Sequence, residues 1–527
     1  MLKKGFFVFF FLLLLCKPEM QKKKSTFAKK PEFKSFEGTV KAPAFPSGLK
    51  WVNTSKPLSL SELKGKVVIL DFWTYCCINC LHVIPDLKKL EEKWKKELVV
   101  IGVHSAKFDT EKESQNIAQA IERYEIQHPV INDNRFEIWN QYGINAWPSF
   151  IILDPEGKVF GKHSGEGVYE LFDEIVRGMV QTFQKKGILN SKPISQVEEA
   201  RKIQQKGSLL FPSKVLISED GQYLFISDTN HNRVLRVERE SGKILNSLGS
   251  GKKGFKDGTF SEAEFFHPQG MAYHSNILYI ADTENHAIRK ADFTTGNIET
   301  LAGNGKQAMN FNISGKGKDV ELNSPWDIVY HENNLYVAMA GSHQIWKIEI
   351  TSAKAGPFAG SSRENIFDGK LLQAALAQPS GICQQGENLY FVDSETSSVR
   401  KASLHPGGEV NTIVGQGLFE FGDVDGDYMD TRLQHPLGIT CDTDKLYITD
   451  TYNNKIKIIK PETRVSISLN TKTVAGNKDG PVSVASFDEP SGLNLYQKYL
   501  YIADTNNHRI RVIDLETRLV STYQIQF

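Results

Sequence analysis

The chain has 527 residues, of which 40% are hydrophobic and 24% are charged, so its composition excludes an intrinsically disordered protein. Its length predicts about two to four domains. The net charge is only +1, but nine lysines and two acidic residues gather in residues 1–34. The rest of the chain therefore carries a net charge of −6, which argues against a nucleic-acid-binding surface.

The first residues have the pattern of a targeting segment. Lys3 and Lys4 precede an apolar run from Gly5 to Leu15, which matches a signal peptide and is too short to span a bilayer. Residues 13–16 (LLLC) resemble a bacterial lipoprotein box, in which Cys16 would be lipidated, although a small residue usually precedes that cysteine. We therefore expect a signal peptide over 1–16, a flexible basic tether over 17–34, and an extracytoplasmic or periplasmic protein anchored to a membrane. Plain secretion and an uncleaved anchor are the alternatives.

From residue 65 the sequence alternates between strand and helix patterns. Continuous apolar runs at 66–73 and 98–103 are typical of strands that are covered on both faces. Between them, apolar residues recur at helical spacing from Leu81 to Trp94. Further elements are expected as a helix over 112–124, a hairpin around the turn at 155–157, and a helix over about 167–184.

Three of the six cysteines lie within five residues, Cys76, Cys77 and Cys80, and Cys77-Ile78-Asn79-Cys80 is a dithiol motif at the start of the expected helix. Two cysteines in one helical turn can bring their sulfurs within bonding reach. The unpaired N–H groups of a helix N-terminus favour a thiolate at the first cysteine, which attacks a substrate disulfide before the second cysteine resolves the mixed disulfide. A structural disulfide or a vestigial site is the alternative. The isolated Cys383 and Cys441 are not expected to form a structural staple.

Four features occur in the order that is found in the thioredoxin fold, in the variety of membrane-anchored extracytoplasmic thioredoxin-like proteins: the strand end at 71–73 (DFW), the Cys77/Cys80 pair, Pro85, and residues 147–149 (WPS). The resemblance covers about residues 35–184 and implies an α/β thioredoxin-like domain. It also implies that Asp71 lies buried under the dithiol and relays a proton from Cys80. Pro148 would be a cis-proline that docks an extended substrate strand. Asp71 could instead be an ordinary hydrogen-bonded carboxylate at a strand end.

The motif departs from that family, because Ile78-Asn79 stands in place of Gly-Pro and Cys76 in place of an aromatic residue. Cys76 and Trp147 are therefore candidate modulators of the dithiol. Cys76 either exchanges with the other two cysteines or only packs as a small side chain. Three thiols without a spaced histidine pair do not complete a zinc site, so no metal and no cofactor is expected. His82 is expected to be a solvated helix residue.

From residue 206 the sequence repeats, and a proline begins a short apolar strand in each copy: Pro212, Pro268, Pro325, Pro379, Pro436 and Pro490. Each is followed by a second strand that resembles residues 278–282 (LYIAD). A fixed period with several short strands per unit is the signature of a propeller or a solenoid.

Residues 228–231 (DTNH), 282–286 (DTENH) and 504–508 (DTNNH) resemble the NHL repeat, which implies an all-β six-bladed propeller over 206–527, after a linker over 185–205. We expect these polar residues to cap turns rather than to bind a metal or catalyse. Asp423, Asp425 and Asp427 alternate as in a calcium loop, but the closing glutamate is missing. Four recurrent basic residues are expected on a solvated strand face, or alternatively on a basic rim that recruits an acidic partner: Arg289, Arg400, Lys457 and Arg511.

The order of signal, tether, thioredoxin-like domain and propeller resembles the thioredoxin/NHL-repeat proteins related to NHL repeat-containing protein two. The resemblance implies an extracytoplasmic thiol–disulfide oxidoreductase that acts on protein disulfides through Cys77 and Cys80, with a propeller that recruits a protein partner. The alternative is a membrane-tethered scaffold whose thioredoxin-like domain is only structural. An enzyme site on the propeller itself ranks third, because no set of convergent ligand residues supports it.

Overall fold

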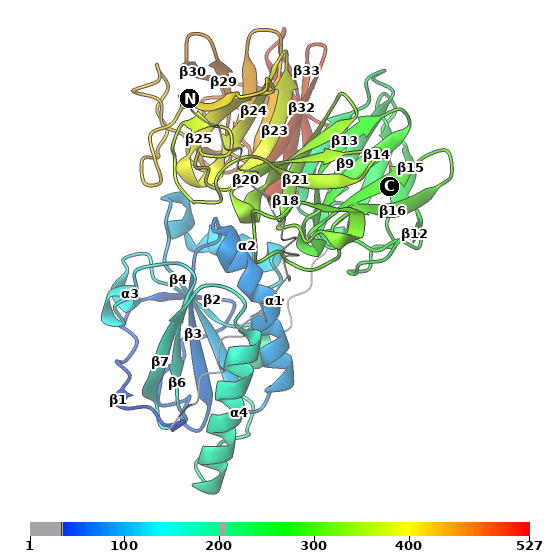
Figure 1. Ribbon diagram of the computed structural model, residues 1–527. Helices are drawn as coiled ribbons and strands as arrows, with labels where there is room; N and C mark the ends of the chain where they lie inside the picture. The colour runs from blue at the N-terminus through cyan, green and yellow to red at the C-terminus, as the bar shows by residue number, and fades with distance from the viewer. Residues whose placement is uncertain (1–32, 34, 201–206) are drawn as a thin grey trace, which may run out of the picture.

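The computed structural model describes residue 33, residues 35–200 and residues 207–527 as two domains that lie against each other (Figure 1). The expected signal segment with Cys16, and the expected tether apart from Phe33, lie outside the described residues. Phe33 packs against Phe36 and Phe160 with its ring centroid 5.5 and 5.6 Å from theirs. Every helix among the described residues falls short of the length and apolarity that a membrane crossing needs.

The first domain is built on a seven-stranded mixed sheet in the order β1-β7-β6-β3-β4-β5-β2. Its strands are β1 (Val40–Lys41), β2 (Lys50–Val52), β3 (Val67–Trp73), β4 (Leu98–His104), β5 (Val130–Asn132), β6 (Ser149–Leu153) and β7 (Lys158–Ser164). β3 and β4 pair in parallel and are buried at every residue, whereas β3 and β6 pair antiparallel. The expected buried strands at 66–73 and 98–103 are thus the centre of the sheet.

Helices cover both faces of this sheet: α1 (Ile78–Lys93), α2 (Ser114–Arg123), α3 (Glu137–Gln141) and α4 (Tyr169–Lys185). Val67 and Ile69 of β3 pack with α1 and α4, while Val68 and Leu70 pack with α3. This alternation follows from the two-residue period of a strand. The prediction of a thioredoxin-like α/β domain is confirmed. Part of the expected linker packs on this domain, because it holds the short helix α5 (Ser195–Ala200), whose Val197 joins the core.

The second domain is a propeller of six antiparallel sheets, as predicted. Blade one consists of β8 (Pro212–Ile217), β9 (Tyr223–Asp228), β10 (Arg233–Glu238) and β11 (Ile244–Leu248), and blade two of β12 (Gly258–Thr259), β13 (Pro268–His274), β14 (Ile277–Asp282), β15 (Ala287–Asp292) and β16 (Asn297–Ala302). Blade three consists of β17 (Gly315–Lys316), β18 (Pro325–His331), β19 (Asn334–Met339), β20 (Gln344–Glu349) and β21 (Lys354–Ala359), and blade four of β22 (Gly369–Lys370), β23 (Pro379–Gln385), β24 (Asn388–Asp393), β25 (Ser398–Ser403) and β26 (Glu409–Val414). Blade five consists of β27 (Gly438–Cys441), β28 (Leu446–Asp450), β29 (Lys455–Lys460) and β30 (Val465–Ser468), and blade six of β31 (Gly480–Pro481), β32 (Pro490–Tyr496), β33 (Tyr499–Asp504), β34 (Arg509–Asp514) and β35 (Leu519–Thr522).

Side-chain hydroxyls join neighbouring blades through the NHL motifs. In five blades a Thr or Ser directly follows β9, β14, β24, β28 or β33. Its hydroxyl donates to the carbonyl of the next blade's repeated proline, at 2.6 to 2.9 Å. The bond from Thr505 Oγ1 to Pro212 O, at 2.8 Å, joins blade six to blade one and so closes the ring. Blade three has Ala340 at this position, which has no hydroxyl to donate.

The four recurrent basic residues are fully buried, so neither a solvated face nor a basic rim is correct for them. Arg289 lies 2.7 Å from Asp282 and 3.0 Å from Asp257. Arg400, Lys457 and Arg511 each pair in the same way with the aspartates 7 and 32 residues before them. The buried charge is tolerated because two carboxylates compensate it. Two aspartates of the calcium-like loop, Asp423 and Asp425, also lie against Lys457, at 3.1 and 3.2 Å.

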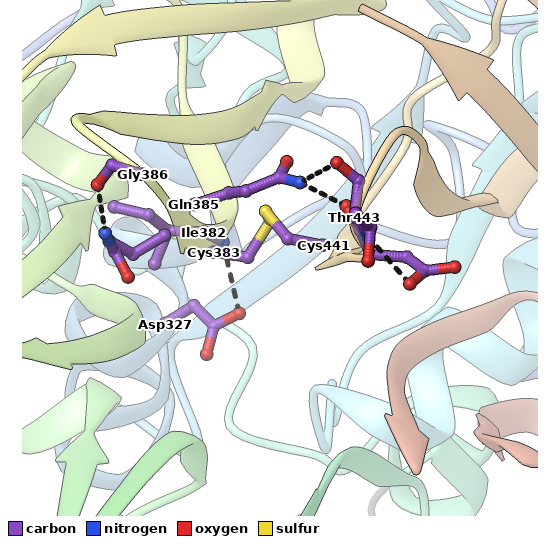
Figure 2. Close-up of a disulfide and its surroundings, with 9 residues drawn as sticks. Asp327, Ile382, Cys383, Gln385, Gly386, Cys441 and Thr443 are labelled. Atoms are coloured by element: carbon purple, nitrogen blue, oxygen red, sulfur yellow. Dashed lines mark hydrogen bonds between the residues drawn. A yellow bond between two sulfur atoms is a disulfide. The ribbon is translucent and has the colours of Figure 1, made fainter. Parts of the chain in front are cut away.

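Cys383 and Cys441 form a disulfide, so the expectation that they stand alone is wrong (Figure 2). Cys383 lies in β23 and Cys441 ends β27, which are neighbouring strands at the edges of blades four and five, and their Cα atoms are 5.8 Å apart. Their separation of 58 residues is close to one repeat period, which places them side by side on neighbouring blades. Cys383 also borders a cavity that Lys214 and Asp327 line, near the centre of the propeller.

Candidate active site

The dithiol lies at the N-terminal end of α1. Cys77 is the residue that precedes the helix, with φ −80° and ψ 113°, and its carbonyl oxygen accepts hydrogen bonds from the N–H groups of Cys80 and Leu81 at 3.0 and 3.2 Å. Cys77 is partly exposed, Cys80 is buried, and both are free thiols. The structure therefore brings together one accessible and one enclosed thiol in the first helical turn.

Asp71 is buried in β3, and its Oδ1 atom has no hydrogen-bond partner among the described residues. Burial raises the pKa of Asp71 to about 7; His128 opposes this shift and Glu91 adds to it. Burial, the hydrogen bond with Cys77 and the negative charges of Cys77 and Asp71 raise the pKa of the Cys80 thiol well above its usual value. A carboxyl group that titrates near neutral pH can accept a proton from this thiol and return it.

The peptide bond between Trp147 and Pro148 is cis, as the resemblance implies. Pro148 itself is buried, and its carbonyl oxygen accepts a hydrogen bond from the Gly165 N–H at 3.1 Å. Trp147 is partly exposed and packs against the apolar cluster that contains Cys77 and Cys80. Trp147 therefore packs against the same apolar cluster as the dithiol.

Cys76 is a free thiol that is enclosed by its surroundings. Its thiol is 2% exposed, and burial, with the charges of Glu111 and Glu395, raises its pKa well above the usual value. Glu111, which sequence reasoning did not single out, accepts hydrogen bonds from the Cys76 N–H at 2.9 Å and the Thr74 hydroxyl at 2.8 Å. These contacts favour the interpretation of Cys76 as a packed side chain.

One face of the propeller covers the N-terminal end of α1 (Figure 1). Six residues, one directly before the repeated proline of each blade, form a pre-proline ring on this face: Phe211, His267, Ser324, Gln378, His435 and Glu489. All six have positive φ angles between 45° and 64°. The N–H of each donates to an Asn, His or Ser side chain of the neighbouring blade, at 2.8 to 3.2 Å. The NHL histidines and asparagines therefore help to fix this ring.

Side chains of the pre-proline ring contact the residues around the dithiol. Gln378 Oε1 accepts a hydrogen bond from the Ile78 N–H, and its Nε2 donates to the Cys76 carbonyl, both at 2.9 Å. Ser324 Oγ lies 2.6 Å from Nε2 of His82. The expectation that His82 is solvated is wrong, because it is buried between this serine and Glu166, which lies 2.9 Å from its Nδ1.

A second polar contact between the domains lies beside Cys76. Lys107 pairs with Glu395 of the propeller, and both side chains are only 5% exposed. Against the lowering effect of burial, the Glu395 carboxylate raises the pKa of Lys107 above its usual value. Phe108 packs against Phe421 and His435 with centroid distances of 4.8 and 5.3 Å. Among the residues that the structure describes, no cluster of His, Cys, Asp and Glu side chains is arranged to hold a metal ion.

Comparison with known proteins agrees with this two-domain architecture. A family model described as thioredoxin-like matches residues 65–159. Over 122 residues, 23% of this chain and 68% of the other, the chain is 29% identical to thiol-disulfide oxidoreductase ResA of Bacillus cereus.

Two longer relatives match nearly the whole chain. The chain is 43% identical over 502 residues to the chloroplastic protein SUPPRESSOR OF QUENCHING 1 of Arabidopsis thaliana, which covers 92% of this chain but only 48% of the plant protein. The chain thus spans about half of that relative's length. It is 40% identical over 526 residues to NHL repeat-containing protein 2 of Bos taurus, covering 93% of this chain and 72% of the bovine one. Because the identity extends through both domains, the chain belongs to the family of NHL repeat-containing protein 2.

Proposed function

We propose that this protein is a thiol–disulfide oxidoreductase that acts on protein disulfides outside the cytoplasm. The observation that carries the proposal is the pair of free thiols, Cys77 and Cys80, in the first turn of α1. The buried carboxyl of Asp71 is one of the groups whose charge raises the pKa of Cys80. The similarity to ResA over the first domain supports the same chemistry.

In the reducing direction, the Cys77 thiolate attacks one sulfur of a substrate disulfide. The substrate S–S bond breaks, its other sulfur leaves as a thiolate and takes a proton from water, and a mixed disulfide forms at Cys77. Asp71 accepts the proton of Cys80, whose thiolate then attacks the Cys77 sulfur. A Cys77–Cys80 disulfide forms, the second substrate thiol is released, and two electrons have passed to the substrate. An external dithiol must reduce the pair before the next cycle.

The surroundings of the dithiol support a protein substrate. The partly exposed indole of Trp147 offers apolar contact area on the cluster against which Cys77 also packs. Pro148, next to it, would dock the extended segment that carries the substrate disulfide. The propeller would recruit the partner that carries this segment, since one of its faces contacts the residues around the dithiol.

Two features support a location outside the cytoplasm. The Cys383–Cys441 disulfide is of a kind that persists in oxidising compartments. The N-terminal sequence pattern fits export and a membrane tether through a lipid on Cys16.

Reduction of insulin disulfides by the full chain, with dithiothreitol as reductant, tests the proposal. We expect the wild type to accelerate the reaction and Cys77→Ser to abolish the acceleration. Cys80→Ser should instead accumulate a mixed disulfide at Cys77, which non-reducing electrophoresis detects. The oxidoreductase function is refuted if the wild type does not accelerate insulin reduction, or if Cys77→Ser is equally active.

The propeller's contact with the dithiol also favours a second candidate, a tethered scaffold in which the first domain is structural. The peptide groups on both sides of Cys77 are bonded to Gln378 rather than free for a substrate. Partner capture by a Cys77→Ser/Cys80→Ser variant at wild-type yield, together with an inactive wild type in the insulin assay, would support this candidate.

A further inference from the structure

Gln378 of the propeller bonds the peptide groups on both sides of the nucleophile. Its side-chain oxygen accepts the Ile78 N–H and its side-chain nitrogen donates to the Cys76 carbonyl, each at 2.9 Å. Gln378 is 2% exposed, so both bonds are shielded from water, whereas Cys77 between them remains partly exposed. A single amide from the second domain thus fixes the loop that carries the nucleophile.

The bond to Ile78 bears on the chemistry of Cys77. Ile78 is the first residue of α1, and the first N–H groups of a helix have no partner within it. These groups stabilise a thiolate at the helix N-terminus. Because the Gln378 oxygen takes the Ile78 N–H, one such donor is occupied, and a partially negative oxygen lies near the reacting sulfur.

Gln378 is held in place by its own backbone. Its N–H donates to Nδ1 of His343 at 3.1 Å, its φ is 64°, and Pro379 follows it. The primary amide of glutamine has an acceptor oxygen and a donor NH₂ group side by side, so it can bond an N–H and a carbonyl at the same time. The other members of the pre-proline ring contact α1, α2 and the loop around Phe108, and none of them bonds both neighbours of Cys77.

We infer that Gln378 is a positioning residue of the dithiol, through which the propeller completes the redox site and sets the reactivity of Cys77. This inference rests on the proposed oxidoreductase function. It assigns the propeller a part in the chemistry in addition to the recruitment of a partner.

Three variants of the full chain test this role. Gln378→Glu keeps the size and the acceptor but replaces the donor with a charged oxygen. Gln378→Met keeps the size and removes both bonds. Gln434→Glu is the matched control, because Gln434 is another buried amide on the same face, and its Oε1 accepts the Asp109 N–H at 3.0 Å without touching the dithiol. The measurement is the pH profile of Cys77 alkylation by iodoacetamide, quantified by mass spectrometry of the peptide that contains Cys77.

We expect Gln378→Glu to move the midpoint of the profile upward by about one pH unit, because a negative charge near the sulfur disfavours the thiolate. Gln378→Met should move it downward, since the Ile78 N–H is released toward the sulfur. Gln434→Glu should leave it in place. The role is refuted if both Gln378 variants keep the wild-type profile, or if the control shifts as much as they do. Should Gln378→Glu fail to fold, the direction of the Gln378→Met shift decides.

Alkylation of Cys77 does not require turnover, so the experiments distinguish a failure of the positioning role from a failure of the oxidoreductase function. If the wild type reduces insulin but the Gln378 variants keep its profile, only the positioning role is wrong. If the variants shift the profile while the wild type reduces no disulfide, only the oxidoreductase function is wrong.

Discussion

Nη2 of Arg123, the last residue of α2, lies 2.6 Å from Oε2 of Glu489 in the propeller. The same carboxylate accepts the hydroxyl of Tyr75, two residues before Cys77, at 3.2 Å. Both charged side chains are largely buried, at 13% and 2% exposure. This pair therefore couples the docking of the propeller to the loop that leads into the dithiol.

Removing the charge of Arg123 alone should weaken the docking of the propeller on the first domain. Arg123→Met leaves the Glu489 carboxylate buried without its partner, which costs about 3–5 kcal/mol. We expect faster hydrogen–deuterium exchange at the Ile78 amide, which the docked propeller protects through Gln378. The double variant Arg123→Met/Glu489→Met, which leaves no unpaired charge, should recover much of the protection. Equal exchange in the wild type and the single variant would show that this pair does not hold the domains together.

Cys76 should be dispensable for catalysis, in contrast to Cys77. Burial and two nearby carboxylates keep its thiol protonated at neutral pH, and only thiolates attack disulfides. Cys76→Ser, with a side chain of similar size, should therefore retain insulin reduction within about twofold, while Cys77→Ser loses it. A loss of more than about tenfold in a folded Cys76→Ser chain would mean that Cys76 exchanges with the other cysteines.

The sequence was sufficient to predict both folds, because the residues around the CxxC motif and the NHL repeat carry resemblances to known families. It did not predict the interface, because the pre-proline ring is defined by a shared backbone conformation while its six positions hold five different residue types. Gln378 and Glu489 occupy equivalent positions yet bond different groups of the first domain.

Two other features of the structure are reflected in spacings along the sequence. The buried basic residues follow their aspartates at fixed spacings, as Arg289 follows Asp282 and Asp257. Such a recurrence indicates a structural pair repeated in each blade rather than a functional surface. The separation of Cys383 and Cys441 by about one repeat period likewise indicates neighbouring strands.

The Cys383–Cys441 disulfide should stabilise the propeller. It closes a loop of 58 residues, for which the restriction of the unfolded chain is worth about 4 kcal/mol. We expect Cys383→Ala/Cys441→Ala to lower the denaturant midpoint of unfolding, monitored by tryptophan fluorescence. Reductant should lower the midpoint of the wild type and leave that of the double variant unchanged. A wild-type midpoint that does not respond to reductant would argue against the disulfide.

Asp71 should act in the resolving step rather than in the first attack. Asp71→Asn cannot accept the Cys80 proton, so we expect release of substrate from the mixed disulfide to slow by about 100-fold at pH 7. The first attack, by the partly exposed Cys77, should change little. Rapid acid quenching, followed by mass spectrometry of the trapped mixed disulfide, separates the two steps. Equal slowing of both steps would indicate a general distortion of the site.

The same variant should also reveal how Asp71 affects stability. Burial raises the pKa of Asp71 to about 7 in the folded chain, whereas the same carboxyl in an unfolded chain has its ordinary pKa of 3.8. Between these values the folded state binds the additional proton, so the contribution of Asp71 to stability falls as the pH rises from about 4 to about 7 and stays low above that. Asp71→Asn removes this penalty. Its melting temperature, measured by scanning calorimetry, should therefore exceed that of the wild type by a few degrees at pH 8, and the difference should shrink toward pH 4. A difference that does not depend on pH would mean that the carboxyl does not titrate in this range.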